Sequence, residues 1–247
     1  MNGLGIVAAF AAEARTLGAA PRELRRPAEL ADGTLIILSG VGPAAASDGA
    51  RRLAAAGAEA LLSWGMAGGL DPSLAAGTLV VPQEVISPDG TVFTTAPEWR
   101  QRVTSAIPPP RPICSGRLLT CAEPLGSPES KSLAFRRTAA VAVDMESSAI
   151  AEVAAEVRLP FLAVRAIVDT ATDQVPRAAL AALTPETGAL RIGRLLAALA
   201  RSPTEVRALI RLGGCYRSAR RALTAVASSG VLAPAPPPVR AMSGTHP

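Results

Sequence analysis

Residues 139–169 read AAVAVDMESSAIAEVAAEVRLPFLAVRAIVD and combine two apolar runs with a helical pattern between them. The apolar run at 141–143 stops at the polar triplet Asp144-Met145-Glu146. An Ala-rich amphipathic segment follows, and a Leu-Pro pair ends it. A second apolar run from Phe161 to Val168 then ends on Asp169. This pattern predicts a strand, a helix and a strand, with the two strands parallel because the connection is long enough for a crossover.

The ends of these two strands carry the polar residues of the stretch. If the strands run parallel, Asp144, Met145 and Glu146 lie at the same edge of the sheet as Asp169. That edge, formed by the carboxyl ends of the strands, is where open α/β sheets bind their ligands. Carboxylates are poor material for an apolar core, so the sequence predicts a functional site at this edge.

The remaining sequence up to residue 200 repeats the alternation of strands and helices. Apolar runs predict strands over 4–10, 34–39, 60–64, 77–82 and 113–121, and helices are expected over 11–15 and 44–56. The turn at 39–43 could bring backbone N–H groups to an anion or a sugar. Glycines within 65–70 permit close approach by a ligand after the third strand. Residues 87–112 are expected to be rich in loops.

The C-terminal part differs in composition from the rest of the chain. Residues 178–200 predict one or two helices, and Arg-rich amphipathic patterns over 204–212 and 216–226 predict two more. Residues 228–247 are rich in Pro, Ser and Gly and are expected to be disordered. The expected organisation is a single α/β domain at 1–200, an Arg-rich helical extension at 201–227 and a tail at 228–247.

Composition and charge exclude several classes of function. The formal net charge is +5, and no dense basic run alternates with aromatic residues, so nucleic acid is not expected as a partner. Cys114, Cys121 and Cys215 are odd in number and lack CxxC spacing, which argues against a disulfide framework and a zinc site. His246 is the only histidine and lies next to the C-terminus. Histidine-dependent triads, histidine-ligated metals and other cofactors are therefore not predicted.

The same features predict a location in the cell. No basic region precedes a signal-type apolar core, and no apolar run approaches the roughly 20 residues of a spanning helix. Together with the cysteine pattern, this predicts a protein of the reducing cytoplasm. The arginines are expected to be solvated, with contact to anionic lipid headgroups as the alternative.

Five motifs occur in one order along the chain and together resemble the purine nucleoside phosphorylase/nucleosidase superfamily. They are GIVAAFAAEARTL at the start of the chain, SGVGPAAA at 39–46, WGMAGGLDPSLAAGTLVVP at 64–82, AVAVDMESSAIA at 140–151 and PFLAVRAIVDTATD at 160–173. The similarity is to its 5′-methylthioadenosine/S-adenosylhomocysteine nucleosidase-like branch. Residues 64–72 and 143–148 resemble members associated with hopanoid biosynthesis, which are thought to remove adenine from adenosylhopane. The resemblance implies a single-domain, three-layer α/β/α nucleoside phosphorylase-like fold with a mixed, mostly parallel sheet, and makes residues 1–200 the catalytic domain.

Cleavage of a purine N-glycosidic bond passes through an oxocarbenium-like sugar while charge builds on the departing base. The resemblance implies that Asp169 is the general acid toward purine N7, and burial favours this role because it raises the pKa of a carboxyl group. It implies that Glu13 activates the attacking water, that Glu146 accepts hydrogen bonds from the ribose 2′- and 3′-hydroxyls, and that Met145 packs on the sugar. Taken alone, Asp169 is equally well explained as a helix or loop cap. Taken alone, Glu13 is more commonly explained as a helix N-terminal residue that interacts with the helix dipole.

Five further residues are assigned to substrate binding. Asp144 stands where nucleosidases of this family commonly have Glu, and it either binds the substrate or caps the following helix. The glycine-rich motif contributes Met66, Ala67 and Gly68. Phe10 is expected to join Met66 in lining an apolar pocket for the 5′ group.

Water and phosphate are compared as the nucleophile. Phosphorolytic relatives typically bind phosphate with an arginine and a serine, at the positions held here by Ser63 and Met66. Neither residue is a cation, Met66 donates no hydrogen bond, and Glu13 would repel a dianion. Hydrolysis is therefore predicted. Phosphorolysis to free base and ribose 1-phosphate is the alternative, and it would require a distant arginine such as Arg51, Arg136 or one from another subunit.

A third alternative is a nucleoside-binding module without catalysis, since a fold does not fix a function. The presence of Glu13, Glu146 and Asp169 argues against it. The expected partner is a small purine nucleoside, and the resemblance implies a homo-oligomer. In the alternative to simple solvation, the Arg-rich helices after residue 203 would hold the protein near the inner membrane surface, close to a hopanoid substrate.

Overall fold

The fold is organised around one long central strand. A computed structural model describes residues 3–19, 21, 23–107, 109, 111–176 and 206–232. Strand β4 (Ala60–Gly69) pairs with three others: β1 (Leu4–Ala8) and β11 (Phe161–Asp169) lie parallel to it, and β10 (Ala140–Asp144) lies antiparallel to it.

The other strands extend the sheet on both sides of this centre. The main order is β2-β3-β1-β4-β10-β9-β6-β7, while β11 also pairs with β5, and β5 with β8. Their bounds are β2 (Ala28–Glu29), β3 (Leu35–Leu38), β5 (Leu79–Val80), β6 (Glu84–Ile86), β7 (Val92–Thr94), β8 (Ile113–Cys114) and β9 (Arg117–Thr120). Parallel pairing joins β3, β1, β4 and β11, so the sheet is mixed and mostly parallel, as predicted.

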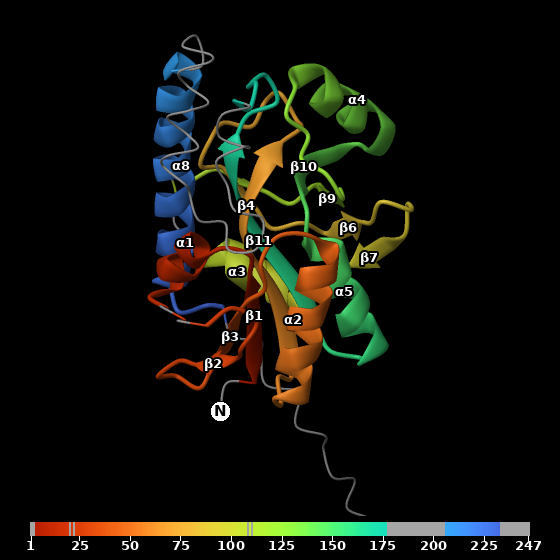
Figure 1. Cartoon of the computed structure of the whole chain (residues 1–247), viewed down its shortest axis with the longest axis vertical. Helices are drawn as coiled ribbons and strands as arrows, with labels where there is room; N and C mark the ends of the chain where they lie inside the picture. The colour runs from red at the N-terminus through yellow and green to blue at the C-terminus, as the bar shows by residue number, and fades with distance from the viewer. Residues whose placement is uncertain are drawn as a thin grey trace, which may run out of the picture.

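Helices cover both faces of the sheet and give three layers (Figure 1). One face carries α2 (Pro43–Ala55) and α5 (Ser147–Glu156). The other carries α8 (Val206–Ala227), with α1 (Ala11–Ala14), the short 3₁₀ helix η1 (Arg15–Leu17) and α3 (Pro97–Ser105) nearby. Helix α4 (Pro128–Thr138) precedes β10. The predicted α/β/α fold is confirmed.

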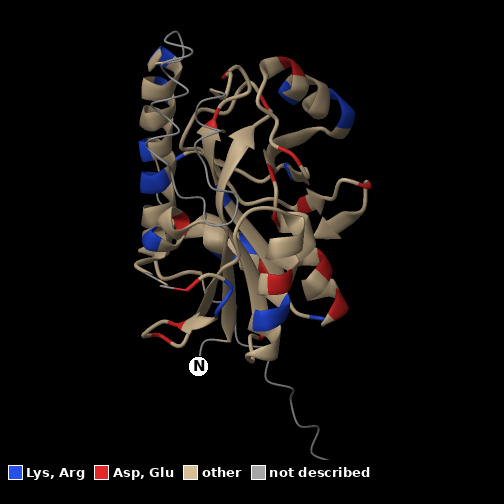
Figure 2. Cartoon of the chain, viewed as in Figure 1, with Lys and Arg blue, Asp and Glu red and all other residues tan. Residues whose placement is uncertain are grey.

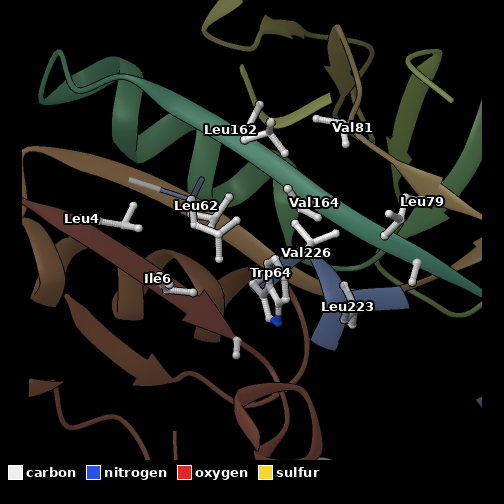
Figure 3. Packing of buried hydrophobic residues seen from close by; sticks show 14 of the residues in the cluster. Leu4, Ile6, Leu62, Trp64, Leu79, Val81, Leu162, Val164, Leu223 and Val226 are labelled. Atoms are coloured by element: carbon white, nitrogen blue, oxygen red, sulfur yellow. The ribbon is translucent and has the colours of Figure 1, made fainter. Parts of the chain in front are cut away.

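Alternation along the strands produces two separate apolar layers. Leu62 and Trp64 of β4 pack with Leu223 and Val226 of α8 on one face (Figure 3). Leu61 instead packs with residues of α2 and α5 on the other face. Because α8 shares the core with β1, β4 and β11, it forms an integral layer of the fold.

The two strands of the 139–169 stretch do not pair as predicted. β11 runs parallel to β4, whereas β10 pairs antiparallel with Gly68 and Gly69 at the end of β4. The prediction of two parallel strands was wrong because β4 continues through the glycine-rich motif, which was expected to form a turn. The strand ends still converge, since Gly68 pairs with both Val143 and Asp169.

The 87–112 range, which was expected to be rich in loops, also holds β7 and α3, and α3 buries Trp99 and Val103. One further prediction of local structure was wrong. The two expected Arg-rich helices are one helix, α8, which continues through Gly213 and Gly214. Its buried Ala and Leu residues pack along β11, and this tertiary packing outweighs the low helix propensity of glycine.

The expected C-terminal tail is ordered at its beginning. The carbonyl of Leu232 accepts a hydrogen bond from Trp99 Nε1 at 2.9 Å, and Leu232 is buried. The rest of the tail, 233–247, and the helices expected over 178–200 lie outside the described residues. Basic residues recur along α8 (Figure 2), and every helix in the described ranges is too short or too polar to cross a bilayer.

Candidate active site

A buried arginine lies at the centre of the predicted site. Arg165 of β11 is 1% exposed. Its Nη2 lies 2.7 Å from Asp144 Oδ2 and 3.9 Å from Glu146 Oε2. The same nitrogen donates to the hydroxyls of Ser63 at 2.6 Å and Ser147 at 3.1 Å. Within the described part of the chain, Arg165 Nε is a buried polar atom with no hydrogen-bond partner.

Glu13 faces this arginine across Gly65. A side chain at residue 65 would place its Cβ 2.4 Å from both Glu13 Oε1 and Arg165 Nη1, so only glycine fits between them. Oε1 of Glu13 accepts a hydrogen bond from the Met66 N–H at 2.8 Å. Oε2 accepts from the N–H of Phe10, the N-cap residue of α1, at 3.1 Å. Glu13 therefore has the structural role of a helix N-terminal residue and also lies in the predicted site.

Glu146 is held by backbone N–H groups. Gly42 donates to Oε1 at 3.0 Å, and Met145 donates to Oε2 at 3.3 Å. The turn at 39–43 was expected to bring N–H groups to an anion or a sugar, and in the structure the N–H of Gly42 in this turn donates to the carboxyl group of Glu146. Met145 is only partly buried, so it lies at the boundary of this arrangement.

Asp144 supports the helix that follows it. Its Oδ2 accepts from the N–H of Ser147, the first residue of α5, at 3.2 Å, a contact in keeping with the alternative of a capping role, although the N-cap residue of α5 is Glu146. Its Oδ1 accepts from the Thr120 hydroxyl at 2.8 Å. With Arg165 bound to Oδ2 as well, both carboxylate oxygens have protein partners.

Glu13, Asp144 and Glu146 form one buried group around Arg165, which we call the Arg165 cluster. Burial raises the pKa of Glu13, and the positive charge of Arg165 opposes this rise. Burial also raises the pKa of Glu146 to about 7; Arg165 opposes the rise, whereas Asp144 adds to it. Burial would lower the pKa of Arg165, but the surrounding carboxylates outweigh this effect and raise it. Three carboxyl groups thus share one guanidinium.

Asp169 lies in a different environment at the end of β11. The register between β11 and β4 shifts between Ile167 and Asp169, and such a bulge re-aims the side chains that follow it. Oδ2 of Asp169 pairs with the ammonium of Lys131, a residue of α4 with no exposed surface. Burial raises the pKa of Asp169, and Lys131 opposes this rise. We call these two residues the Lys131 pair.

A cavity of about 410 Å³ opens next to Asp169. Its walls are the segment after β11 and the first half of α8: Asp169, Thr172, Asp173, Gln174, Arg207, Ala208, Arg211, Leu212 and Cys215. Glu13 and Glu146 do not belong to these walls.

The structure therefore places the predicted residues in two groups joined by β4. A Cβ at Gly65 would meet Glu13 and Arg165, while a Cβ at Gly68 would lie 3.3 Å from Asp169 Oδ2. The two glycines are three residue steps apart along the strand, which is roughly 10 Å. The side chain of Ala67 packs in the core, so only its backbone is available to a ligand. Met66 and Phe10 are partly buried beside Glu13.

Sequence reasoning missed two residues of this arrangement, Arg165 and Lys131. Arg165 had a signal, because it is the one charged residue inside the otherwise apolar run from Phe161 to Val168. Lys131 also had one, because it is the only lysine in a chain whose other basic residues are arginines. Among the described residues, no group of three or more His, Cys, Asp or Glu side chains could hold a metal ion.

The sequence profile of the family described as "Phosphorylase superfamily" matches residues 28–202, which is more than half of the chain. The chain belongs to this superfamily. The matched range includes Asp144, Glu146 and Arg165 of the Arg165 cluster and both residues of the Lys131 pair. Glu13 lies before the matched range.

Several solved enzyme structures share the fold of this chain at low sequence identity. The 5′-methylthioadenosine/S-adenosylhomocysteine nucleosidase of Neisseria meningitidis, in complex with methylthio-immucillin-A, has a TM-score of 0.69 and 18% identity and covers 93% of this chain and 98% of its own. The S. pneumoniae enzyme with a transition-state inhibitor has a TM-score of 0.66 and 17% identity, over 93% and 98%. Futalosine hydrolase of Helicobacter pylori has a TM-score of 0.62 and 17% identity, over 91% and 97%. At these identities the similarity establishes the fold.

Proposed function

We propose that this protein hydrolyses the N-glycosidic bond of a purine nucleoside, with adenine as the base and an apolar group at the 5′ position. The similar nucleosidases bind nucleoside analogues, which supports a nucleoside as the substrate class. The motifs shared with hopanoid-associated members point to adenosylhopane, which would give ribosylhopane and adenine.

The observation that carries the choice of water is the charge of the Arg165 cluster. Three carboxyl groups surround one guanidinium, and Arg165 is already bound by Asp144, Ser63 and Ser147. A phosphate dianion would enter a buried site that already holds three carboxyl groups and one cation, at a cost of several kcal/mol. A neutral water meets no such repulsion.

The proposed mechanism uses both groups of residues. Asp169 transfers its proton to N7 of the purine as the bond from C1′ to the base breaks and its electron pair passes to the base. Glu146 accepts hydrogen bonds from the ribose hydroxyls, which holds the sugar as positive charge develops on it. Glu13 takes a proton from water as the water oxygen bonds to C1′.

The alternative with a specific observation in its favour is phosphorolysis. Arg165 is a cation that contacts Ser63, one of the two positions at which phosphorolytic relatives typically bind phosphate, and its Nε lacks a partner among the described residues. The sequence motifs alone did not anticipate this arginine. Its three carboxylate neighbours argue against a free anion site.

Mass spectrometry of the products tests the proposal. Adenosine, methylthioadenosine and adenosylhopane are incubated with the protein, with and without phosphate. Hydrolysis predicts free adenine and a free ribosyl product at a rate independent of phosphate. Ribose 1-phosphate or its 5′-substituted analogue, formed only with phosphate, would establish phosphorolysis. No base release from any purine nucleoside would refute both.

A further inference from the structure

The only lysine of the chain is buried against the proposed general acid. Lys131 lies in the first part of α4, which starts at Pro128 after the N-cap Ser127. The ammonium donates to Asp169 Oδ2, to the carbonyl of Thr170 at 2.8 Å and to the carbonyl of Asp173 at 2.9 Å. Three donated bonds are the full complement of an ammonium group, and a neutral amine would leave one acceptor without a donor.

The site is matched to lysine rather than arginine. Its acceptors are one carboxylate oxygen and two carbonyls of the segment that follows β11, arranged around a single nitrogen. A compact ammonium with three donors satisfies such an arrangement, whereas the planar fork of a guanidinium does not. Apart from His246, every other basic residue in the chain is an arginine, so the lysine here is an exception to its composition.

Lys131 is the cation in direct contact with Asp169. Asp173 faces Asp169 from the following segment, and its own Oδ1 is paired with Arg211 of α8 at 2.5 Å. Arg207 and Cys215 of α8 line the same cavity. Arg211 therefore offsets Asp173, while the charge of Lys131 acts on Asp169 itself.

The pairing uses one of the two oxygens of Asp169. No described residue donates a hydrogen bond to Oδ1, and the side chain lines the cavity beside α8. We propose that Lys131 is a positioning residue: it fixes Oδ2 so that Oδ1 faces the base, and it stabilises the carboxylate that remains after the proton has moved to N7. Lys131 keeps its own protons throughout. This inference rests on the proposed function, in which Asp169 is the general acid.

The direct test is the pKa of the Asp169 carboxyl, measured by ¹³C NMR in protein labelled at aspartate and assigned with Asp169→Asn. Removal of the ammonium in Lys131→Met is expected to raise this pKa by about 1 to 3 pH units, because an adjacent cation lowers a carboxyl pKa by that amount. Arg211→Met is the matched control, since it removes a cation of the same cavity that does not touch Asp169. An unchanged pKa in Lys131→Met, or an equal rise in both variants, overturns the proposal.

A second variant, Lys131→Gln, keeps the test possible if Lys131→Met does not fold. Lys131→Gln removes the charge but keeps an amide that can donate to two of the three acceptors. It is expected to raise the Asp169 pKa in the same way, and an unchanged value there also overturns the proposal.

The pH profile of kcat/KM links this measurement to catalysis. Activity needs protonated Asp169, so it falls as pH rises through the Asp169 pKa. In Lys131→Gln this limb should move to higher pH, while the plateau falls at least tenfold. If the wild type releases base but neither change occurs, the role of Lys131 is refuted and the proposed function stands. If the wild type releases no base, the proposed function fails, and the catalytic role of Lys131 fails with it.

Discussion

The Arg165 cluster and the Lys131 pair both place buried carboxyl groups next to a cation, but they differ in the number of carboxyl groups for each cation. In the Arg165 cluster, Glu13, Asp144 and Glu146 share one guanidinium, so acidic groups outnumber the cation. In the Lys131 pair, one carboxylate has one ammonium to itself. The first arrangement repels anions and favours proton uptake by its glutamates. The second fixes one carboxyl group at a cavity wall.

In the proposed function, the two groups have separate tasks at the two ends of Gly65–Gly68. The Arg165 cluster can hold a sugar and a water, because carboxylate oxygens accept hydrogen bonds from hydroxyls. The Lys131 pair can supply a proton, because a buried carboxyl next to a cavity has a raised pKa. Each of the following substitutions alters either the Lys131 pair or the Arg165 cluster and leaves the other group intact.

Asp169→Asn removes the acid and keeps the shape of the side chain. The rate of base release is expected to fall about 10²- to 10⁴-fold, the usual contribution of a general acid, with KM little changed. Steady-state kinetics on the best nucleoside of the product screen measures it. Asp89→Asn, in an exposed turn, is the matched control and should retain wild-type kinetics. Undiminished kcat in Asp169→Asn would contradict the assignment.

Arg165→Met leaves the three carboxyl groups of the Arg165 cluster without their cation. Removing one partner of a buried ion pair costs about 3 to 5 kcal/mol of unfolding free energy. Urea denaturation measures the loss. Arg51→Met is the control: Arg51 pairs with Glu156 at 2.7 Å, but both side chains are about half exposed, so about 0 to 1 kcal/mol is expected. An equal loss of unfolding free energy in the two variants would show that the buried carboxyl groups do not depend on the charge of Arg165.

Glu146→Gln tests the raised pKa. The native pKa of about 7 exceeds the reference value of 4.5, so the folded protein binds more protons and stability falls as pH rises between these values. The rise corresponds to about 3 kcal/mol. The variant should therefore gain about 3 kcal/mol relative to wild type between pH 5 and pH 8.5. For Glu156→Gln, on the surface, the difference in unfolding free energy from wild type should change by less than about 1 kcal/mol over the same pH range. If this difference does not change with pH for Glu146→Gln, the pKa of Glu146 is not raised.

Ser63→Ala gives the smallest expected effect. Arg165 Nη2 loses one neutral acceptor but keeps Asp144 and Ser147, so unfolding free energy should fall by about 1 to 2 kcal/mol. The exposed Ser73→Ala should change it by less than about 0.5 kcal/mol. A loss comparable to that of Arg165→Met would mean that Ser63, rather than the carboxylates, holds the guanidinium.

The sequence predicted the fold class because strand and helix periodicity is local. The sequence-based predictions were wrong where an element depends on distant residues. The length of β4 follows from its contacts with β10 and β11. Helix α8 is continuous because it packs on β11. The positions of Glu13, Glu146 and Asp169 came from motif resemblance. Their partners were not predicted, since Lys131 lies 38 positions from Asp169 in the chain. Nothing in one local pattern specifies such a contact.

The structure of Asp169→Asn bound to methylthioadenosine tests the central claim most directly, namely that both groups of residues act on one molecule. The expected result is one nucleoside along Gly65–Gly68, with its ribose hydroxyls on Glu146, its N7 at residue 169 and a water between Glu13 and C1′. A nucleoside held entirely in the cavity beside α8, out of contact with Glu13 and Glu146, would contradict the account.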